Sequence, residues 1–266
     1  CKAASITPSI SALAMTAALY HCLNHAFFKS LLFLATGHVL HATGERNLGK
    51  LGGLIHRMPW LAFLTLVGAL SIASLPPLNG FVSEWLLLQA FLFSPELPNP
   101  YLHMLVPAAA GALVLAAALG GYVMVKFYGV VFLGRPREEK LAAARDAGNW
   151  ERAGLIWLAA GCVLLGVFPV YVITQLDYVT MDLIGRSLGE TAAKSGWLFL
   201  TPVAPERASY SPLLSLVVIA AAVGFTYWMV RLLYHGRLRR GDAWDCGYPQ
   251  QTPRMQDTAE GFGQPI

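Results

Sequence analysis

Long apolar stretches alternate with shorter polar ones along the whole chain. A membrane-crossing helix needs about 20 mostly apolar residues. Five stretches meet that length, approximately Ser9–Leu40, Trp60–Phe93, His103–Leu133, Gly154–Leu176 and Pro212–Leu233. Strands of a transmembrane barrel would be shorter and would alternate apolar with polar residues. The pattern therefore predicts an all-α membrane protein with five transmembrane helices.

The second apolar stretch contains a segment that cannot continue as a regular helix. Pro76 and Pro77 remove two backbone donors, and Gly80 weakens the helix further. A broken helix at membrane depth must line a cavity or be covered by protein. We therefore expect this span to be broken at Pro76–Gly80, with a half-helix on each side.

The composition agrees with a membrane-embedded core. Charged residues make up 13% of the 266 residues, hydrophobic residues 56%, and the mean hydropathy is +0.52. A soluble domain carries about 25% charged residues. The net charge of +4 is not gathered in one patch. These values argue against a soluble globular protein and against a partner that is a nucleic acid.

The lysines and arginines between the spans are placed asymmetrically, and cytoplasmic loops normally carry the excess. One side holds 13 of them: Arg46, Lys50, Arg57, Arg135, Arg137, Lys140, Arg145, Arg152, Arg231, Arg237, Arg239, Arg240 and Arg254. The other side holds 4, namely Lys2, Arg186, Lys194 and Arg207. This asymmetry favours five crossings with a cytoplasmic C-terminal tail.

The first span carries a row of titratable side chains, His21, His25 and Lys29. Their i, i+4, i+8 spacing places them on one helix face, over about 12 Å of helix length. Each ionisable group at membrane depth costs about 2.5–3.5 kcal/mol on insertion scales. We interpret the row as a proton relay bridged by waters. The alternative is that these residues only hold helices together by polar packing.

Two further ionisable residues lie within the predicted spans. Glu84 is the only acid in any of the five, and it follows Gly80 in the first turn of the second half-helix. The positive end of that half-helix favours a carboxylate, as at the broken helices of ion transporters. The alternative is a structural kink in which Glu84 pairs with a lysine. Lys126 either ends the relay toward the cytoplasm or extends its ammonium to the membrane surface.

Four segments resemble a known family. They are YHCLNHAFFKSLLFL at Tyr20–Leu34, LGGL at Leu51–Leu54, LPPLNGFVSEW at Leu75–Trp85 and WDCGY at Trp244–Tyr248. Together they resemble the proton-translocating, antiporter-like membrane subunits of respiratory complex I, multisubunit sodium/proton antiporters and membrane-bound hydrogenases. The chain is most similar to the large membrane subunit of hydrogenase-4 or formate hydrogenlyase. The family's complex I members of the largest type have lysine at the position of Glu84, so the acid favours the hydrogenase type.

The resemblance implies a bundle with two inverted repeats of five helices, each with one broken helix. The chain then corresponds to a C-terminal fragment. Residues 1–176 would be part of the antiporter-like transmembrane domain, 177–210 an external loop with or without a short interfacial helix, 211–234 an additional transmembrane helix and 235–266 a truncated cytoplasmic tail. His21, His25 and Lys29 match a central relay, and Glu84 matches the residue of the broken helix near the exit path.

The resemblance also implies a function. We expect a membrane subunit of a redox-driven complex, of the hydrogenase-4/formate hydrogenlyase or NADH–quinone oxidoreductase type, that conducts protons through buried Lys, His and Glu residues in a prokaryotic inner membrane. Its expected partners are other membrane subunits, a peripheral hydrogenase or dehydrogenase arm on the cytoplasmic side, the lipid bilayer, and protons or Na⁺. Alternatives are a Na⁺/H⁺ antiporter subunit and a non-conducting structural anchor of the redox arm.

No cofactor is expected in this chain itself. The four cysteines, Cys1, Cys22, Cys162 and Cys246, form no CxxC pair. There is no iron–sulfur, Rossmann or haem motif. Ni–Fe, Fe–S or quinone groups are therefore expected only in partner subunits, and the chain should catalyse no redox chemistry itself.

Overall fold

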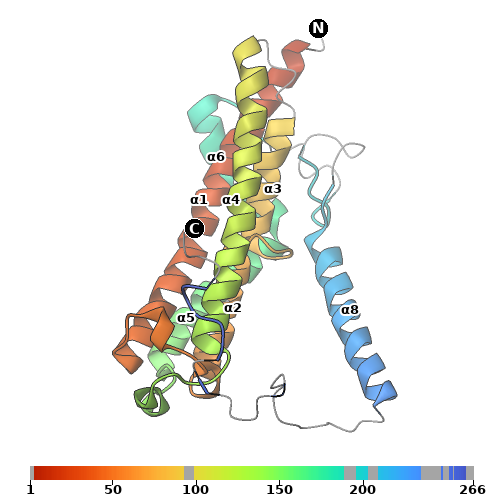
Figure 1. Cartoon of the computed structure of the whole chain (residues 1–266). Helices are drawn as coiled ribbons and strands as arrows, with labels where there is room; N and C mark the ends of the chain where they lie inside the picture. Colours follow the sequence, from red (N-terminus) through yellow and green to blue (C-terminus); the bar gives the residue numbers. More distant parts are fainter. Residues whose placement is uncertain are drawn as a thin grey trace.

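The computed structural model describes residues 3–92, 99–188, 196–202, 209–234, 247, 252–253 and 255–261, with side chains of α1 described from residue 10. These residues form a helical bundle (Figure 1). The α-helices are α1 (Ala3–Thr43), α2 (Pro59–Ile72), α3 (Asn79–Leu92), α4 (Pro100–Phe132), α5 (Asn149–Val167), α6 (Pro169–Ile184) and α8 (Pro212–Leu233). Short 3₁₀ turns are η1 (Leu48–Lys50), η2 (Leu54–His56) and η4 (Glu139–Ala143).

The helix lengths support only part of the five-crossing prediction. By length and composition, three of the described helices can cross a membrane: α4, α5 and α8. The helix α2 is apolar but shorter. The first predicted span lies within α1, and the last coincides with α8. A chain with several such helices is an integral multi-pass membrane protein, and the number of crossings stays a prediction.

The second predicted span is interrupted, because α2 ends at Ile72 and α3 begins at Asn79; Pro76 and Pro77 lie in the interruption, whereas Gly80, which the prediction included in the break, lies in the first turn of α3. The two half-helices approach so closely that a Cβ at Gly80 would collide with the carbonyl oxygen of Ser71. On the other side, Gly166 of α5 lies against the backbone at Pro77. Neither position has room for a side chain. The break is thus packed against α5 on one side, while its residues 73–78 are half-buried or exposed and partly line a cavity, which a broken helix in a membrane can do.

The fourth predicted span is wrong as a single continuous helix. The chain bends at Phe168, where α5 ends and α6 begins at Pro169. A proline at that position has no N–H for the carbonyl of Leu165, four residues earlier. The Tyr20 hydroxyl of α1 donates to that carbonyl instead. The helix α6 continues to Ile184, so the first part of the predicted external loop is helical.

The helix α1 forms the centre of the bundle and packs against α2, α3, α5 and α6. Two apolar clusters surround it. One contains Phe28, Leu31, Leu61, Phe132 and Cys162, and the other contains Leu13, Tyr20, Val82, Leu86 and Ile173. The most apolar part of α4 has no buried residues. Figure 1 shows α8 to one side of the bundle.

Candidate functional site

The titratable row of the first span lies on α1, as its spacing predicts. The rings of His21 and His25 are adjacent, with their centroids 6.2 Å apart. The Lys29 ammonium lies 5.9 Å from the centroid of the Phe33 ring, a distance at which a cation is attracted to a π-face. His21 and Lys29 are half-buried, and His25 is exposed. The row therefore opens on one side to the surface of this chain.

One member of the row contacts the broken helix. The Nδ1 atom of His21 lies 3.1 Å from the hydroxyl oxygen of Ser83 in α3. Ser83 is fully buried, and its hydroxyl donates to the Gly80 carbonyl at 3.2 Å. The Ser83 hydroxyl can accept from a protonated Nδ1 of His21 while it donates to the carbonyl, or it can donate to Nδ1 in the other tautomer. The α1 row thus meets α3 one residue before Glu84.

Glu84 itself faces a cavity on the α4 side of α3. This cavity has a volume of about 450 Å³ and is lined by Ser74, Phe81, Glu84 and Trp85 near the break, and by Leu113, Val114 and other residues of α4. Glu84 is half-buried. Ser74, at the end of the break, has a positive φ of 54°, which is uncommon for a residue with a side chain. Glu84 and Ser74 thus line one cavity beside the break, and the hydroxyl of Ser74 itself is shielded from solvent.

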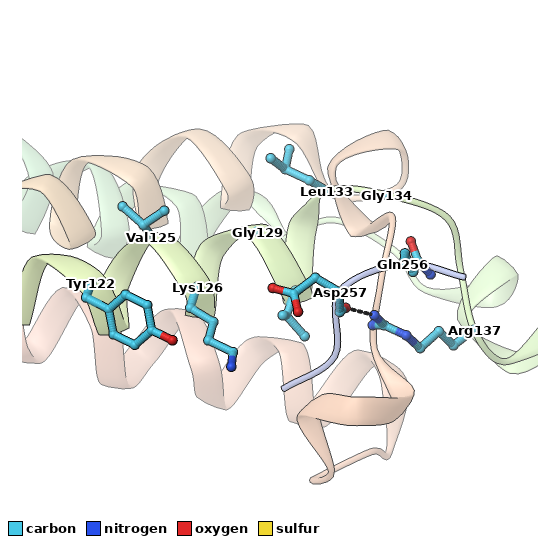
Figure 2. Close-up of a pocket in the computed structure, with 10 residues that line it drawn as sticks. Tyr122, Val125, Lys126, Gly129, Leu133, Gly134, Arg137, Gln256 and Asp257 are labelled. Atoms are coloured by element: carbon cyan, nitrogen blue, oxygen red, sulfur yellow. Dashed lines mark hydrogen bonds between the residues drawn. The ribbon is translucent and has the colours of Figure 1, made fainter. Parts of the chain in front are cut away.

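Lys126 lines a separate cavity of about 390 Å³ at the far end of α4 (Figure 2). Its ammonium is shielded from solvent and has no hydrogen-bond partner among the described residues. Tail residues form one wall: Gln256 donates to the Arg135 carbonyl at 2.8 Å, and Arg137 donates to the Asp257 carbonyl. The tail therefore helps to enclose the end of the lysine side chain.

A third cavity lies along α4 between the cavities that Glu84 and Lys126 line. This middle cavity has a volume of about 420 Å³. It shares Ala73 and Gly121 with the cavity at Glu84, and Val125, Gly129 and Leu133 with the cavity at Lys126. Apart from the Tyr128 hydroxyl, its lining is apolar. Glu84 and Lys126 therefore line the first and the last of three adjoining cavities along α4, and we refer to this series of cavities as the groove.

The expectation of buried charges is wrong for this chain by itself. Across the described ranges, every buried polar side chain is neutral: Thr16, Asn24, Thr43, Thr65, Ser71, Asn79, Ser83, Thr180, Thr201 and Ser211. The five predicted pathway residues are half-buried or exposed. For His21, His25, Lys29 and Glu84 this avoids the cost of an unpaired buried charge, which is far higher than that of a neutral polar group; Lys126 differs, because its ammonium is shielded although the residue as a whole is half-buried. The role of all five in conduction stays a prediction.

The sequence interpretation missed three polar residues at the break. Ser83, Asn24 and Asn79 are all fully buried, although Asn24 stands between the two histidines and Asn79 directly precedes Gly80. Their position next to a broken helix was the available signal.

His38, which is outside the row, lies 3.2 Å from the Glu151 carboxylate of α5. In the part of the chain that the structure describes, no group of three His, Cys, Asp or Glu residues could hold a metal ion.

Comparison with known proteins places these features in a family. Residues 5–96, which include the α1 row, the break and Glu84, match the family described as "NADH:quinone oxidoreductase/Mrp antiporter, TM". The chain is 34% identical over 263 residues to formate hydrogenlyase subunit 3 of Escherichia coli, covering 97% of this chain and 40% of that protein. It is 31% identical over 260 residues to hydrogenase-4 component B of the same organism, covering 97% and 38%.

A solved structure agrees with the fold. The membrane-bound sulfane sulfur reductase, an archaeal respiratory membrane complex, contains a chain that matches with a TM-score of 0.68 and 27% identity, over 89% of this chain and 36% of that one. The present chain thus spans about 40% of the length of the curated relatives it matches. It belongs to the family of proton antiporter-like membrane subunits, which includes formate hydrogenlyase subunit 3 and hydrogenase-4 component B.

Proposed function

We propose that this chain is a membrane subunit that conducts protons in a redox-driven complex of the hydrogenase-4/formate hydrogenlyase or NADH–quinone oxidoreductase type. The main support is the contact between His21 and Ser83, which joins the titratable row of α1 to the broken helix next to Glu84. Because titratable groups that exchange protons must be connected by hydrogen bonds or water, this contact is the link that the row needs. The family membership gives independent support.

In the proposed mechanism, redox chemistry in another subunit changes the charge near the bundle. Protons then shift along Lys29, His25 and His21, toward or from Glu84. The groove from Glu84 to Lys126 gives a second segment of the path, with its end at the tail. In this proposal Lys126 ends the relay. If Lys126 only extends its ammonium to the membrane surface, removing the Lys126 side chain should not change proton movement.

The proposal includes partners and orientation. Other membrane subunits and a peripheral hydrogenase or dehydrogenase arm would assemble with the chain, with the arm and the C-terminal tail on the cytoplasmic side. Ni–Fe, Fe–S or quinone groups would reside in those partners and none in this chain. A purely structural role as the membrane anchor of the redox arm is the alternative to conduction. A Na⁺/H⁺ antiporter subunit is a second candidate, favoured by the antiporters included in the matched family.

The decisive experiment uses membrane vesicles that contain the complete complex with the full-length subunit. Glu84→Ala should abolish coupled proton movement. The expected loss is about 10²–10⁴-fold, as when a proton-transferring group is removed from an enzyme. The redox reaction should persist in part. Glu139→Ala, which removes an exposed carboxylate of η4, is the matched control and should leave proton movement unchanged.

The outcomes separate the three functions. Wild-type proton movement in Glu84→Ala would remove Glu84 from the path. If Lys29→Ala and Glu84→Ala alter the amount of assembled complex but not the protons moved per electron, the chain is a structural anchor. If vesicles exchange Na⁺ for protons without any redox partner, the antiporter function holds instead.

A further inference from the structure

Two asparagines join α1 to the start of α3. Asn24 and Asn79 are both fully buried. The Asn24 side-chain amide donates to the Asn79 carbonyl at 2.8 Å, and the Asn79 amide donates to the Asn24 carbonyl at 3.4 Å. Because each amide nitrogen faces a carbonyl oxygen, reversing either side chain would bring two acceptors together. The free atom of each asparagine is therefore its Oδ1.

Both Oδ1 atoms are shielded from solvent and accept no hydrogen bond from any described residue. The Ser74 hydroxyl, which lies 3.6 Å from the Cβ position of Gly80, is also shielded and unpartnered there. A buried polar atom without a partner costs about 1–3 kcal/mol. Proteins satisfy such atoms with ordered water, which binds two to four polar partners. The unpartnered oxygens around the break thus require a donor.

The residues that carry these oxygens contact both titratable parts of the site. On one side, the Asn79 carbonyl that accepts from Asn24 is also 3.5 Å from the Ser83 hydroxyl, which contacts His21. On the other side, Ser74 lines the cavity of Glu84. Asn79 thus contacts the hydroxyl that meets His21, and Ser74, close to Gly80, lines the cavity of Glu84, so the unpartnered oxygens belong to residues that connect the two sides.

We propose that the asparagine pair, Asn24 and Asn79, together with Ser83, holds ordered water that carries protons between His21 and Glu84; this inference rests on the proposed function. Protonated His21 releases its Nδ1 proton to the Ser83 oxygen, while the Ser83 hydroxyl rotates away from the Gly80 carbonyl and gives its own proton to a bound water. That water passes a proton on through its neighbours to the Glu84 carboxylate. His21 ends neutral and Glu84 ends protonated, and the reverse sequence restores both.

Water fits these residues better than a metal cation does. The buried polar side chains in the described ranges are all neutral, so no buried carboxylate offsets a positive ion at this place. Burying an ion without such a partner costs several kcal/mol, whereas fixing one water costs about 0–2 kcal/mol. The asparagine pair and Ser83 act as positioning residues in this scheme, since they orient the water and hold no charge.

The test compares Ser83→Ala with Ser83→Thr in vesicles that contain the complete complex. Ser83→Ala removes the hydroxyl and should lower the rate of proton movement at least about tenfold, with the redox reaction partly retained. Ser83→Thr keeps a hydroxyl and should move protons at close to the wild-type rate. Thr180→Val is the matched control, because Thr180 is equally buried but bonds only within α6, and it should have no effect.

Asn24→Leu removes one of the water-binding oxygens and should slow proton movement in the same way. A role in packing alone would not change the ratio of rates in H₂O and D₂O, whereas a disturbed proton hop should raise it. If Asn24→Leu does not accumulate in membranes, the two Ser83 variants decide. Wild-type rates and isotope ratios in Ser83→Ala would overturn the inference, as would a Ser83→Thr variant as slow as Ser83→Ala.

The same vesicles distinguish this inference from the proposed function. If Glu84→Ala stops proton movement and Ser83→Ala does not, only the water site is refuted. If neither variant changes proton movement, the proposed function fails as well. The transport rate of the wild type could also depend on Na⁺ and lose that dependence in Asn24→Leu. The asparagine oxygens would then bind Na⁺, and the water site would be overturned.

Discussion

Replacing Tyr20 by phenylalanine tests how the bend between α5 and α6 is stabilised. Pro169 offers no N–H, so the Leu165 carbonyl loses its normal partner within the helix. The Tyr20 hydroxyl, on a side chain with 0% exposure, donates to that carbonyl. In Tyr20→Phe the carbonyl is left without a donor, and the buried position prevents bulk water from replacing it. The variant should therefore be less stable than the wild type.

The size of the loss follows from the burial. An unsatisfied buried carbonyl costs about 1–3 kcal/mol in soluble proteins. Side-chain hydrogen bonds between helices in membranes average about 0.6 kcal/mol and reach about 1.7. Because the ring itself stays in place, no cavity contribution is added. We therefore expect Tyr20→Phe to lower the free energy of unfolding by about 1–2 kcal/mol.

The assay is reversible unfolding in mixed detergent micelles with increasing SDS, followed by circular dichroism. Tyr227→Phe, which removes a hydroxyl from an exposed side chain of α8, is the control and should change little. Pro169→Ala restores the missing N–H, so adding Tyr20→Phe to that variant should cost clearly less. An equal loss with and without Pro169, or no loss in Tyr20→Phe, would refute the explanation of the bend.

Three other substitutions test contacts outside the proposed path. Gly166→Ala should lower the free energy of unfolding by about 1–3 kcal/mol, because its Cβ would collide with the Pro77 carbonyl, while Gly224→Ala in open space should not. Gly134→Ala should increase hydrogen exchange at residues 255–261, because Gly134 has a φ of +74° and its Cβ would displace the Gln256 side chain; unchanged exchange would contradict the contact. Hydrogen bonds from Lys140 and the Asn47 backbone lower the pKa of Glu45 from 4.5 to about 2. The stabilisation by the ionised carboxylate is therefore present above pH 4.5 and is lost as the pH falls toward 2. In an unfolding series over that pH range, the stability difference between Glu45→Gln and the wild type should close.

The sequence predicts the parts of this fold that depend on local chemistry. Pro76 and Pro77 interrupt an apolar run within a few residues of Gly80, and the break follows from backbone geometry alone. Pro169 acts by the same principle, but apolar residues continue on both sides of it and hide the bend. The missing donor is supplied by Tyr20, 145 residues away in the chain. No local pattern reveals such a partner.

The candidate site divides in the same way. The spacing of His21, His25 and Lys29 defines one helix face without any tertiary information, and the structure retains their order. The contact of His21 with Ser83 depends on how α1 packs against α3, and serine is too common to be singled out by type. The common groove of Glu84 and Lys126 depends likewise on the packing of α4 against the break.

The distribution of charge within the bundle limits how protons can pass through it. His21, His25, Lys29 and Glu84 are half-buried or exposed, while the residues at its centre near the break are neutral asparagines and serines. Neutral amides cannot hold a proton at ordinary pH, but they can orient a water that does. Transfer between the α1 row and Glu84 through this centre therefore needs a bound water or a hydroxyl at each step. Since removing Ser83 or Asn24 leaves every titratable group in place, a loss of transport in those variants would locate the transfer at the neutral centre and exclude a route around its surface.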